Sequence, residues 1–153
     1  MKEYLKKVQQ AKVYEVAKVT PLEKATNLSR RFNNNIYLKR EDLQEVFSFK
    51  IRGAFNKMRN LTKKQLSKGV ITSSAGNHAQ GVALSALRLN SKATILMPVT
   101  TPLVKVNAVK ELKAEVILFG ENYDDSYSEA IRISKEKNLS FIHPFDDPDV
   151  IAG

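Results

Sequence analysis

The second half of the sequence alternates short apolar runs with longer amphipathic segments, and this alternation restricts the possible folds more than any other feature. The apolar runs begin near residues 70, 93, 115 and 140, and the segments between them have helical periodicity. Continuously apolar strands that alternate with helices are typical of a parallel sheet, whose right-handed crossovers place helices on both faces. We therefore predict an α/β unit with the order β-α-β-α-β-α-β.

The bounds of the expected elements follow from apolar periodicity and from helix start and stop signals. Within this unit we expect strands at 70–72, 93–97, 115–119 and 140–142, and helices at 77–89, from Thr101-Pro102 and from a cap near Asp124. Before it we expect a polar helix at the start, a helix at 21–32 capped by Thr20, a strand at 36–38, a helix from Ser48 to Asn60, and a short helix with a Thr62/Gln65 capping box. The unit spans residues 57–145, and the flanking segments belong to something else.

Composition narrows the function classes. Of the 153 residues, 42% are hydrophobic and 8% aromatic, which is ordinary for a soluble globular protein. The chain has no cysteine and two histidines, so we expect no disulfide and no metal site. No run approaches the ~20 apolar residues of a membrane-spanning helix, and the start lacks a secretory signal. We expect a cytoplasmic protein that does not bind a membrane.

The net charge of +9 is unevenly distributed. Residues 1–70 hold 17 Lys/Arg and 6 Asp/Glu, a net of +11, whereas residues 71–153 hold 8 and 10, a net of −2. The basic residues are not interleaved with aromatic residues as in a base-stacking surface. We interpret them as solvated helix faces and expect no nucleic-acid binding. A basic nucleic-acid binder is the alternative, which salt-dependent binding would reveal.

One candidate ligand site is the segment Ser-Phe-Lys-Ile-Arg-Gly-Ala at residues 48–54, which begins a predicted helix. In α/β folds, ligands gather at the carboxyl ends of strands and the amino ends of helices. Lys50 is unusual there, because an exposed cation opposes the helix dipole by up to about 1 kcal/mol. A lysine bound covalently through its amine avoids much of this conflict. From position alone, Lys50 is also compatible with an ordinary solvent-facing lysine, one of eighteen.

The second candidate is the segment Ser-Ser-Ala-Gly-Asn-His-Ala-Gln-Gly at residues 73–81, between a predicted strand and a helix. Small residues allow a ligand to approach the backbone, and successive N–H groups can hold a carboxylate or phosphate. Gly76 and Gly81 have the spacing of a P-loop, but Val-Ala follows where Lys-Ser/Thr is required. Nucleotide chemistry is therefore not expected. No carboxylate partner can be assigned to His78, so we interpret its side chain as hydrogen-bonded rather than catalytic.

Together, these segments resemble the serine/threonine dehydratase family of pyridoxal-phosphate enzymes, which have the tryptophan synthase β-like architecture called fold type II. The matching segments are Lys-Arg-Glu-Asp-Leu-Gln at 39–44, residues 48–54 and residues 74–81. Residues 144–153 are similar to the family's segment that leads back into the larger domain. The resemblance covers nearly the whole chain.

The resemblance implies a truncated fold type II α/β architecture of parallel sheets with flanking helices. Residues 1–56 would begin the larger catalytic domain, residues 57–145 would form the small domain, and residues 146–153 would return to the larger one. The family's glycine-rich loop for the cofactor phosphate and the residue that faces the pyridine nitrogen would lie beyond Gly153. We therefore expect the 153-residue chain alone to be inactive.

The resemblance also implies roles for individual residues. Lys50 would carry pyridoxal 5'-phosphate covalently and take the α-proton of the substrate. Phe49 would pack against the cofactor ring, and Asn77 would hydrogen-bond its 3-hydroxyl oxygen. The substrate carboxylate would be held by the backbone N–H groups of Ser74, Ala75, Gly76, Asn77 and His78. Glu45 departs from the family, which commonly has proline at this position, but this change removes no ligand.

The activity that the resemblance implies is dehydration of L-threonine to 2-oxobutanoate and ammonia, the first step of isoleucine biosynthesis, with L-serine as a second candidate substrate. Residues 19–22 and 39–42 are closer to the biosynthetic branch than to the catabolic branch. Alternatives are a catabolic threonine/serine dehydratase, a serine racemase, or a non-catalytic remnant. Ala75 argues against racemisation, because racemases of this fold carry a serine there. The complete protein would be a homo-oligomer.

Overall fold

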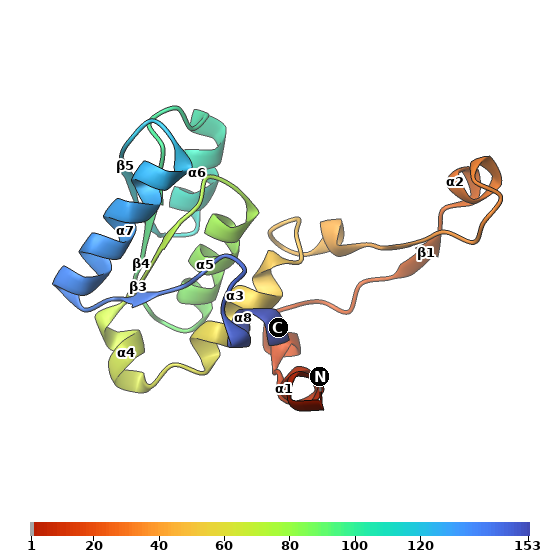
Figure 1. The fold of residues 1–153 in the computed structure, drawn as a ribbon, viewed down its shortest axis with the longest axis horizontal. Coiled ribbons are helices and arrows are strands. Elements are labelled where there is room, and N and C mark those ends of the chain that lie inside the picture. Colours follow the sequence, from red (N-terminus) through yellow and green to blue (C-terminus); the bar gives the residue numbers. More distant parts are fainter. Residues whose placement is uncertain (1) are drawn as a thin grey trace.

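The structure is a computed structural model that describes residues 2–153, and a four-stranded parallel sheet forms its centre (Figure 1). Its strands are β3 (Val70–Ser73), β4 (Ala93–Met97), β5 (Glu115–Leu118) and β6 (Ser140–Phe141), in the order β5-β4-β3-β6. The connecting helices are α5 (Asn77–Arg88), α6 (Leu103–Glu111) and α7 (Tyr123–Lys137). All three strand pairs are parallel. The predicted order of strands and helices is confirmed.

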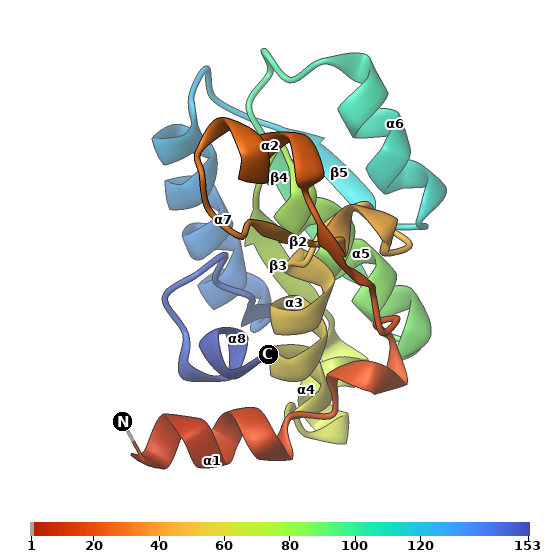
Figure 2. The same ribbon diagram turned by 90° about the vertical axis from the view of Figure 1, so that its right-hand side faces the viewer.

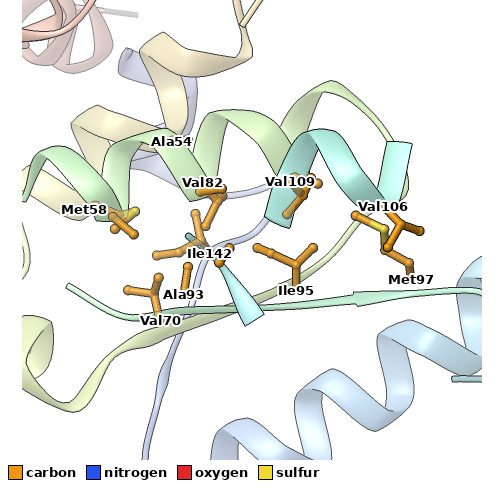
Figure 3. Close-up of a cluster of buried hydrophobic side chains, with 14 residues drawn as sticks. Ala54, Met58, Val70, Val82, Ala93, Ile95, Met97, Val106, Val109 and Ile142 are labelled. Carbon is orange, nitrogen blue, oxygen red and sulfur yellow. The ribbon is translucent and has the colours of Figure 1, made fainter. Parts of the chain in front are cut away.

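Helices cover both faces of this sheet, as the apolar strands require. On one face, Val82 of α5 and Val106 of α6 belong to one buried cluster with Ile95 and Met97 of β4, and Val106 lies beside Met97 (Figure 3). On the other face, Ala130 and Ile133 of α7 belong to a second cluster with residues of β3 and β4. All four residues of β3 are buried, because helices lie on both of its sides.

Two helix starts show how local signals set the bounds. Thr62 and Gln65 form the predicted capping box of α4 (Lys63–Lys68), and Gly69, with φ +106°, ends the helix. The start of α7 differs slightly from the prediction. Its cap is the side chain of Asn122, which accepts the backbone N–H of Asp125 at 3.0 Å, rather than a residue near Asp124. The aspartates instead occupy the first turn, where the helix dipole favours negative charge.

The elements of the amino-terminal region are α1 (Lys2–Gln10), the 3₁₀ helix η1 (Val13–Glu15), β1 (Leu22–Lys24), α2 (Thr26–Arg31), β2 (Tyr37–Lys39) and the 3₁₀ helix η2 (Glu41–Leu43). The segment from β1 to β2 forms an arm that projects from the sheet unit, whereas α1 does not extend with it (Figure 1). The predicted strand near residues 36–38 is confirmed as β2. The predicted helix at 21–32 is wrong in its first part, because residues 22–24 pair antiparallel with β2. Only Thr26–Arg31 is helical.

Backbone pairing explains this correction. The N–H of Arg40 donates to the Pro21 carbonyl at 3.0 Å, and the N–H of Ala25 donates to the Ile36 carbonyl at 2.9 Å. These two bonds extend the antiparallel ladder at both ends. The hydroxyl of Thr20 does not cap a helix but donates to the Glu41 carboxylate at 2.5 Å. Pairing across the arm therefore outweighs the local Thr-Pro helix signal.

Helix α3 (Lys50–Arg59) joins the arm to the sheet unit. It packs against α5, and Ala54 and Met58 are fully buried in the core cluster on the α5 face of the sheet. The last helix, α8 (Pro148–Ala152), lies beside α3 at the carboxyl terminus (Figure 2). Lys57 of α3 forms an ion pair of 2.8 Å with Asp147, and Asn56 donates to the Asp149 carbonyl at 2.7 Å. The last ten residues are thus fastened to the helix that begins with Lys50.

Candidate functional site

Lys50 occupies the first position of α3, and its amine is held by a segment far away in the sequence. The backbone N–H of Lys50 donates to Ser48 Oγ at 3.2 Å, but the residue that precedes the helix is Phe49, whose side chain makes no capping bond. Helix α3 therefore begins one residue later than a cap at Ser48 predicts. Lys50 Nζ donates to the Pro144 carbonyl oxygen at 2.7 Å, across 94 positions of sequence. The same Nζ lies 5.5 Å from the centre of the Phe49 ring, whose side chain is exposed. The amine is therefore placed between an aromatic ring and a carbonyl.

A cavity of about 250 Å³ opens beside this amine. It is lined by Phe49, Lys50, Gly53, Pro144, Phe145, Val150, Ile151 and Gly153. Gly53 allows the close approach of α3 and α8 at its edge, because a β-carbon there would lie 2.6 Å from the Val150 carbonyl oxygen. The cavity combines one amine, two aromatic rings and aliphatic side chains, which is a composition that suits a flat aromatic cofactor.

The loop between β3 and α5 presents backbone groups at a helix amino terminus. Ser74 anchors it, since its N–H donates to the Leu96 carbonyl at 3.0 Å and its Oγ accepts the N–H of Gly76 at 3.3 Å. A β-carbon added to Gly76 would meet no atom within 4 Å, so the space above this backbone is open. Asn77 and His78 begin α5, and their N–H groups have no partner within the helix. Such a loop can hold an anion.

The structure brings the lysine segment and this loop together. Helix α3 crosses α5 at Gly81, where a β-carbon would lie 3.0 Å from the Lys50 carbonyl oxygen. Gly81 is four residues after Asn77, which is about one helical turn. The start of α3 therefore lies about one turn from the end of the loop, although 26 positions of sequence separate Lys50 from Gly76.

His78 makes the hydrogen bond that was expected of it. Its ring is buried, with 3% exposure, and Nε2 lies 3.1 Å from the Ile142 carbonyl oxygen. Burial lowers the pKa of His78 to about 4, and the nearby Lys50 charge acts in the same direction. The ring is therefore neutral near neutral pH.

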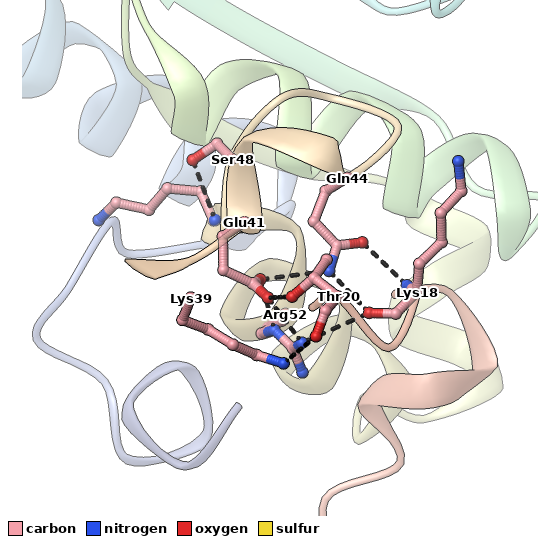
Figure 4. A network of polar contacts seen from close by, with 8 residues as sticks. Lys18, Thr20, Lys39, Glu41, Gln44, Ser48 and Arg52 are labelled. Atoms are coloured by element: carbon pink, nitrogen blue, oxygen red, sulfur yellow. Dashed lines mark hydrogen bonds and ion pairs between the residues drawn. The ribbon is translucent and has the colours of Figure 1, made fainter. Parts of the chain in front are cut away.

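A polar network centred on Glu41 was not predicted from the sequence (Figure 4). The Glu41 carboxylate accepts hydrogen bonds from Arg52 Nε at 2.7 Å and from Gln44 Nε2 at 3.2 Å, besides the Thr20 hydroxyl. Gln44 also bonds both backbone groups of Lys18. The hydrogen bond from Arg52 is the main cause that lowers the pKa of Glu41 to about 2.

The network attaches the extended arm to the helix that begins with Lys50. Arg52 is two residues after Lys50, and its side chain is only 15% exposed. The only sequence signal was the charged run at 39–42, which gave no indication of a partner. Among residues 2–153, no group of three His, Asp or Glu side chains is placed to hold a metal ion, and no helix is long and apolar enough to cross a membrane.

Comparison with known proteins agrees with this geometry. Residues 13–153 match the family model described as pyridoxal-phosphate dependent enzyme. The chain is 58% identical to the biosynthetic L-threonine dehydratase of Burkholderia multivorans, over 99% of this chain and 30% of the relative. It is 57% identical to the chloroplastic biosynthetic threonine dehydratase of Arabidopsis thaliana, over 99% of this chain and 26% of the relative. The chain thus spans between a quarter and a third of these relatives' length.

Solved structures show the same backbone arrangement. The processed form of threonine deaminase isoform 2 from Solanum lycopersicum superposes with a TM-score of 0.94 at 52% identity, covering 99% of this chain and 42% of that one. Maize serine racemase superposes with a TM-score of 0.90 at 30% identity, covering 98% and 45%. These likenesses confirm the predicted fold type II α/β architecture. This chain belongs to the family of pyridoxal-phosphate-dependent enzymes.

Proposed function

We propose that the chain is the amino-terminal part of a threonine dehydratase that uses pyridoxal 5'-phosphate to convert L-threonine to 2-oxobutanoate and ammonia. The observation that carries this proposal is the position of Lys50. Its amine borders a cavity of about 250 Å³, and the backbone of the same residue lies about one helical turn from a loop that can hold an anion. A covalent lysine, an aromatic wall and an anion site are what this cofactor and an amino-acid substrate require.

The residues of the chain fit the cofactor in three respects. Lys50 Nζ is the group that would carry it, and the exposed Phe49 ring would cover one side of the cofactor ring. Asn77 is exposed at the start of α5, where its amide can donate to the ring's hydroxyl oxygen. When bound, pyridoxal phosphate supplies an electron sink that makes the α-proton of an amino acid acidic.

The chain's own groups then orient the substrate and move one proton. The N–H groups at the start of α5, together with the loop before it, would hold the substrate carboxylate. These are the backbone groups of Ser74, Ala75, Gly76, Asn77 and His78. Lys50 Nζ would take the α-proton, because Lys50 is the lysine among the residues that line the cavity. The β-hydroxyl of threonine would then leave.

We infer that the complete protein has two domains. Residues 1–56 and 146–153 would belong to a larger catalytic domain and residues 57–145 to a small one. The contacts between α3 and α8 support the pairing of the two flanking segments. The biosynthetic names of the relatives favour a role in isoleucine biosynthesis. We also propose that the complete protein is a homo-oligomer. We propose a cytoplasmic location, although relatives in plants and in Schizosaccharomyces pombe are named chloroplastic or mitochondrial.

A chimera tests this function directly. Residues 1–153 would be joined to the remaining part of the Burkholderia multivorans dehydratase, of which this chain covers the equivalent of 30%. The chimera should bind pyridoxal phosphate, release 2-oxobutanoate from L-threonine and allow growth without isoleucine in a strain that lacks its own dehydratase. The isolated 153-residue chain should release none.

The matched variants are Lys50→Ala and Lys110→Ala. Loss of the proton carrier should lower turnover by at least about 10²–10⁴-fold, whereas the Lys110 variant on α6 should keep it. A folded chimera that binds the cofactor but does not dehydrate threonine would refute the proposal. Interconversion of serine enantiomers instead would favour the racemase alternative, and a chimera without cofactor binding would favour a non-catalytic remnant.

A further inference from the structure

The imidazole of His78 is buried at the point where β3, α5 and β6 meet. Its Nε2 lies 3.1 Å from the carbonyl oxygen of Ile142, which can only accept a hydrogen bond. The hydrogen must therefore be on Nε2, and Nδ1 carries the lone pair. Among the described residues, Nδ1 is a buried atom with no hydrogen-bond partner.

The carbonyl that His78 binds belongs to Ile142, the residue that directly follows β6. It also accepts the Thr72 hydroxyl at 2.7 Å, and the N–H of the same residue, Ile142, donates to the Ile71 carbonyl at 2.9 Å. Two residues later, the Pro144 carbonyl accepts the Lys50 amine at 2.7 Å. The proline ring restricts the backbone between these two carbonyls. The position of Ile142 is thus transmitted over a short, stiff segment to the acceptor of Lys50.

We propose that His78 is a positioning residue for Lys50. Its Nε2–H fixes the Ile142 carbonyl, which fixes the Pro144 carbonyl, which in turn holds the Lys50 amine beside the cavity. His78 is not among the residues that line the cavity, and its ring makes no hydrogen bond to the Lys50 amine. The importance of His78 for catalysis rests on the proposed role of Lys50. The hydrogen bonds that connect His78 to Lys50 through Ile142 and Pro144 do not depend on that role.

The choice of a histidine supports this assignment. An apolar side chain of similar volume would fill the same space and would not bury an unpaired acceptor, as Nδ1 of His78 does. Packing alone therefore does not explain an imidazole here. The titratable groups that act on the ring are Lys50 on α3 and His143 after β6, and both lower its pKa. With burial, they lower the pKa of His78 to about 4, so the donor on Nε2 persists at neutral pH.

Two variants of the 153-residue chain separate hydrogen bonding from packing. His78→Gln keeps a donor at the place of Nε2, and His78→Met keeps the volume without the donor. Competitive acetylation with limiting acetic anhydride, followed by peptide mass spectrometry, gives the relative reactivity of every lysine. His78→Met should raise the reactivity of Lys50 by about three- to tenfold relative to the exposed Lys110 on α6, because one hydrogen bond to the Ile142 carbonyl is lost. His78→Gln should leave this ratio near that of the unaltered chain.

Three results would overturn the proposal. They are an unchanged Lys50 ratio in folded His78→Met, an equal rise in both variants, and a rise shared by all lysines. A second measurement needs no variant. ¹⁵N NMR of the unaltered chain should show the imidazole proton on Nε2, and a proton on Nδ1 would contradict the proposal. The test uses no cofactor, so it can succeed even if Lys50 does not carry pyridoxal phosphate.

Discussion

A β-carbon on Gly81 would lie 3.0 Å from the carbonyl oxygen of Lys50. It would also lie 3.2 Å from the next backbone nitrogen, that of Ile51. Helix α3 cannot move away from α5 to make room, because α8 lies close on another side and the backbone there is also in tight contact at Gly53. Gly81 therefore allows the start of α3 to lie directly against the backbone of α5.

Gly81→Ala should reduce the free energy of unfolding by about 1 kcal/mol. Overpacking costs about 1–3 kcal/mol, and the better helix propensity of alanine returns about 1 kcal/mol. Gly76→Ala is the control, because its β-carbon meets no atom within 4 Å and the change should stay within about 0.5 kcal/mol. Urea denaturation measures both. A Gly81→Ala protein that gains stability would show that the crossing is looser than described.

Glu41→Gln should destabilise the attachment of the arm. The Glu41 and Arg52 side chains are 16% and 15% exposed, and a hydrogen bond between charged groups contributes about 1.5–3 kcal/mol. The control is Glu136→Gln, whose carboxylate lies at the same 2.7 Å from Arg132 but with both side chains 60% exposed. That change should cost no more than about 0.5 kcal/mol. Equal losses in the two variants would show that burial does not strengthen the Glu41 pair.

Protonation of His78 should make stability depend on pH. Its pKa is about 4 in the folded chain against 6.5 for the ordinary side chain, so the unfolded chain takes up the proton first as pH falls. The stabilisation is complete above about pH 6.5, and about 2 kcal/mol of it should be lost between pH 7 and about pH 4.5. Urea denaturation at both pH values measures this loss. Between the same pH values, the loss of unfolding free energy should be about 2 kcal/mol smaller in the His78→Gln variant. An identical loss in both proteins would contradict the prediction.

Asn77→Ala should affect the cofactor and not the fold. The side chain is exposed at the start of α5, so the free energy of unfolding should change by no more than about 0.5 kcal/mol. In the chimera, loss of a donor to a charged oxygen should weaken pyridoxal phosphate binding by at least about tenfold. Asn107→Ala, at an exposed position of α6, is the control. Unchanged affinity and absorbance of the bound cofactor would leave Asn77 as a helix-start residue only.

The sequence predicts the sheet unit well because its central strands, β3 and β4, are buried along almost their whole length. Residues such as Ile71 and Ile95 lie in continuously apolar runs, and only a strand covered on both faces needs such a run. The arm was predicted only in part, because both of its strands are exposed along their whole length. The pattern at residues 36–38 indicated β2, whereas the residues of β1 follow a Thr-Pro helix signal and show no strand pattern.

The candidate site shows the same contrast between local and distant information. Lys50 and Asn77 stand in recognisable local segments, and the capping signal of Ser48 predicted the start of α3 to within one residue. The acceptor of the Lys50 amine, Pro144, lies 94 residues away and carries no local signal of this contact. The partner of Glu41 is likewise fixed only when the arm folds back on α3. Such pairings depend on tertiary packing, which sequence periodicity does not contain.

If Lys50 carries the cofactor, covalent mapping should identify it as the modified lysine. The chimera would be incubated with pyridoxal phosphate, reduced with borohydride and digested, and the modified lysine would be identified by mass spectrometry. The account predicts one dominant modification, on Lys50, which disappears in Lys50→Ala while the protein stays folded. A dominant modification on another lysine, such as Lys57, would contradict it.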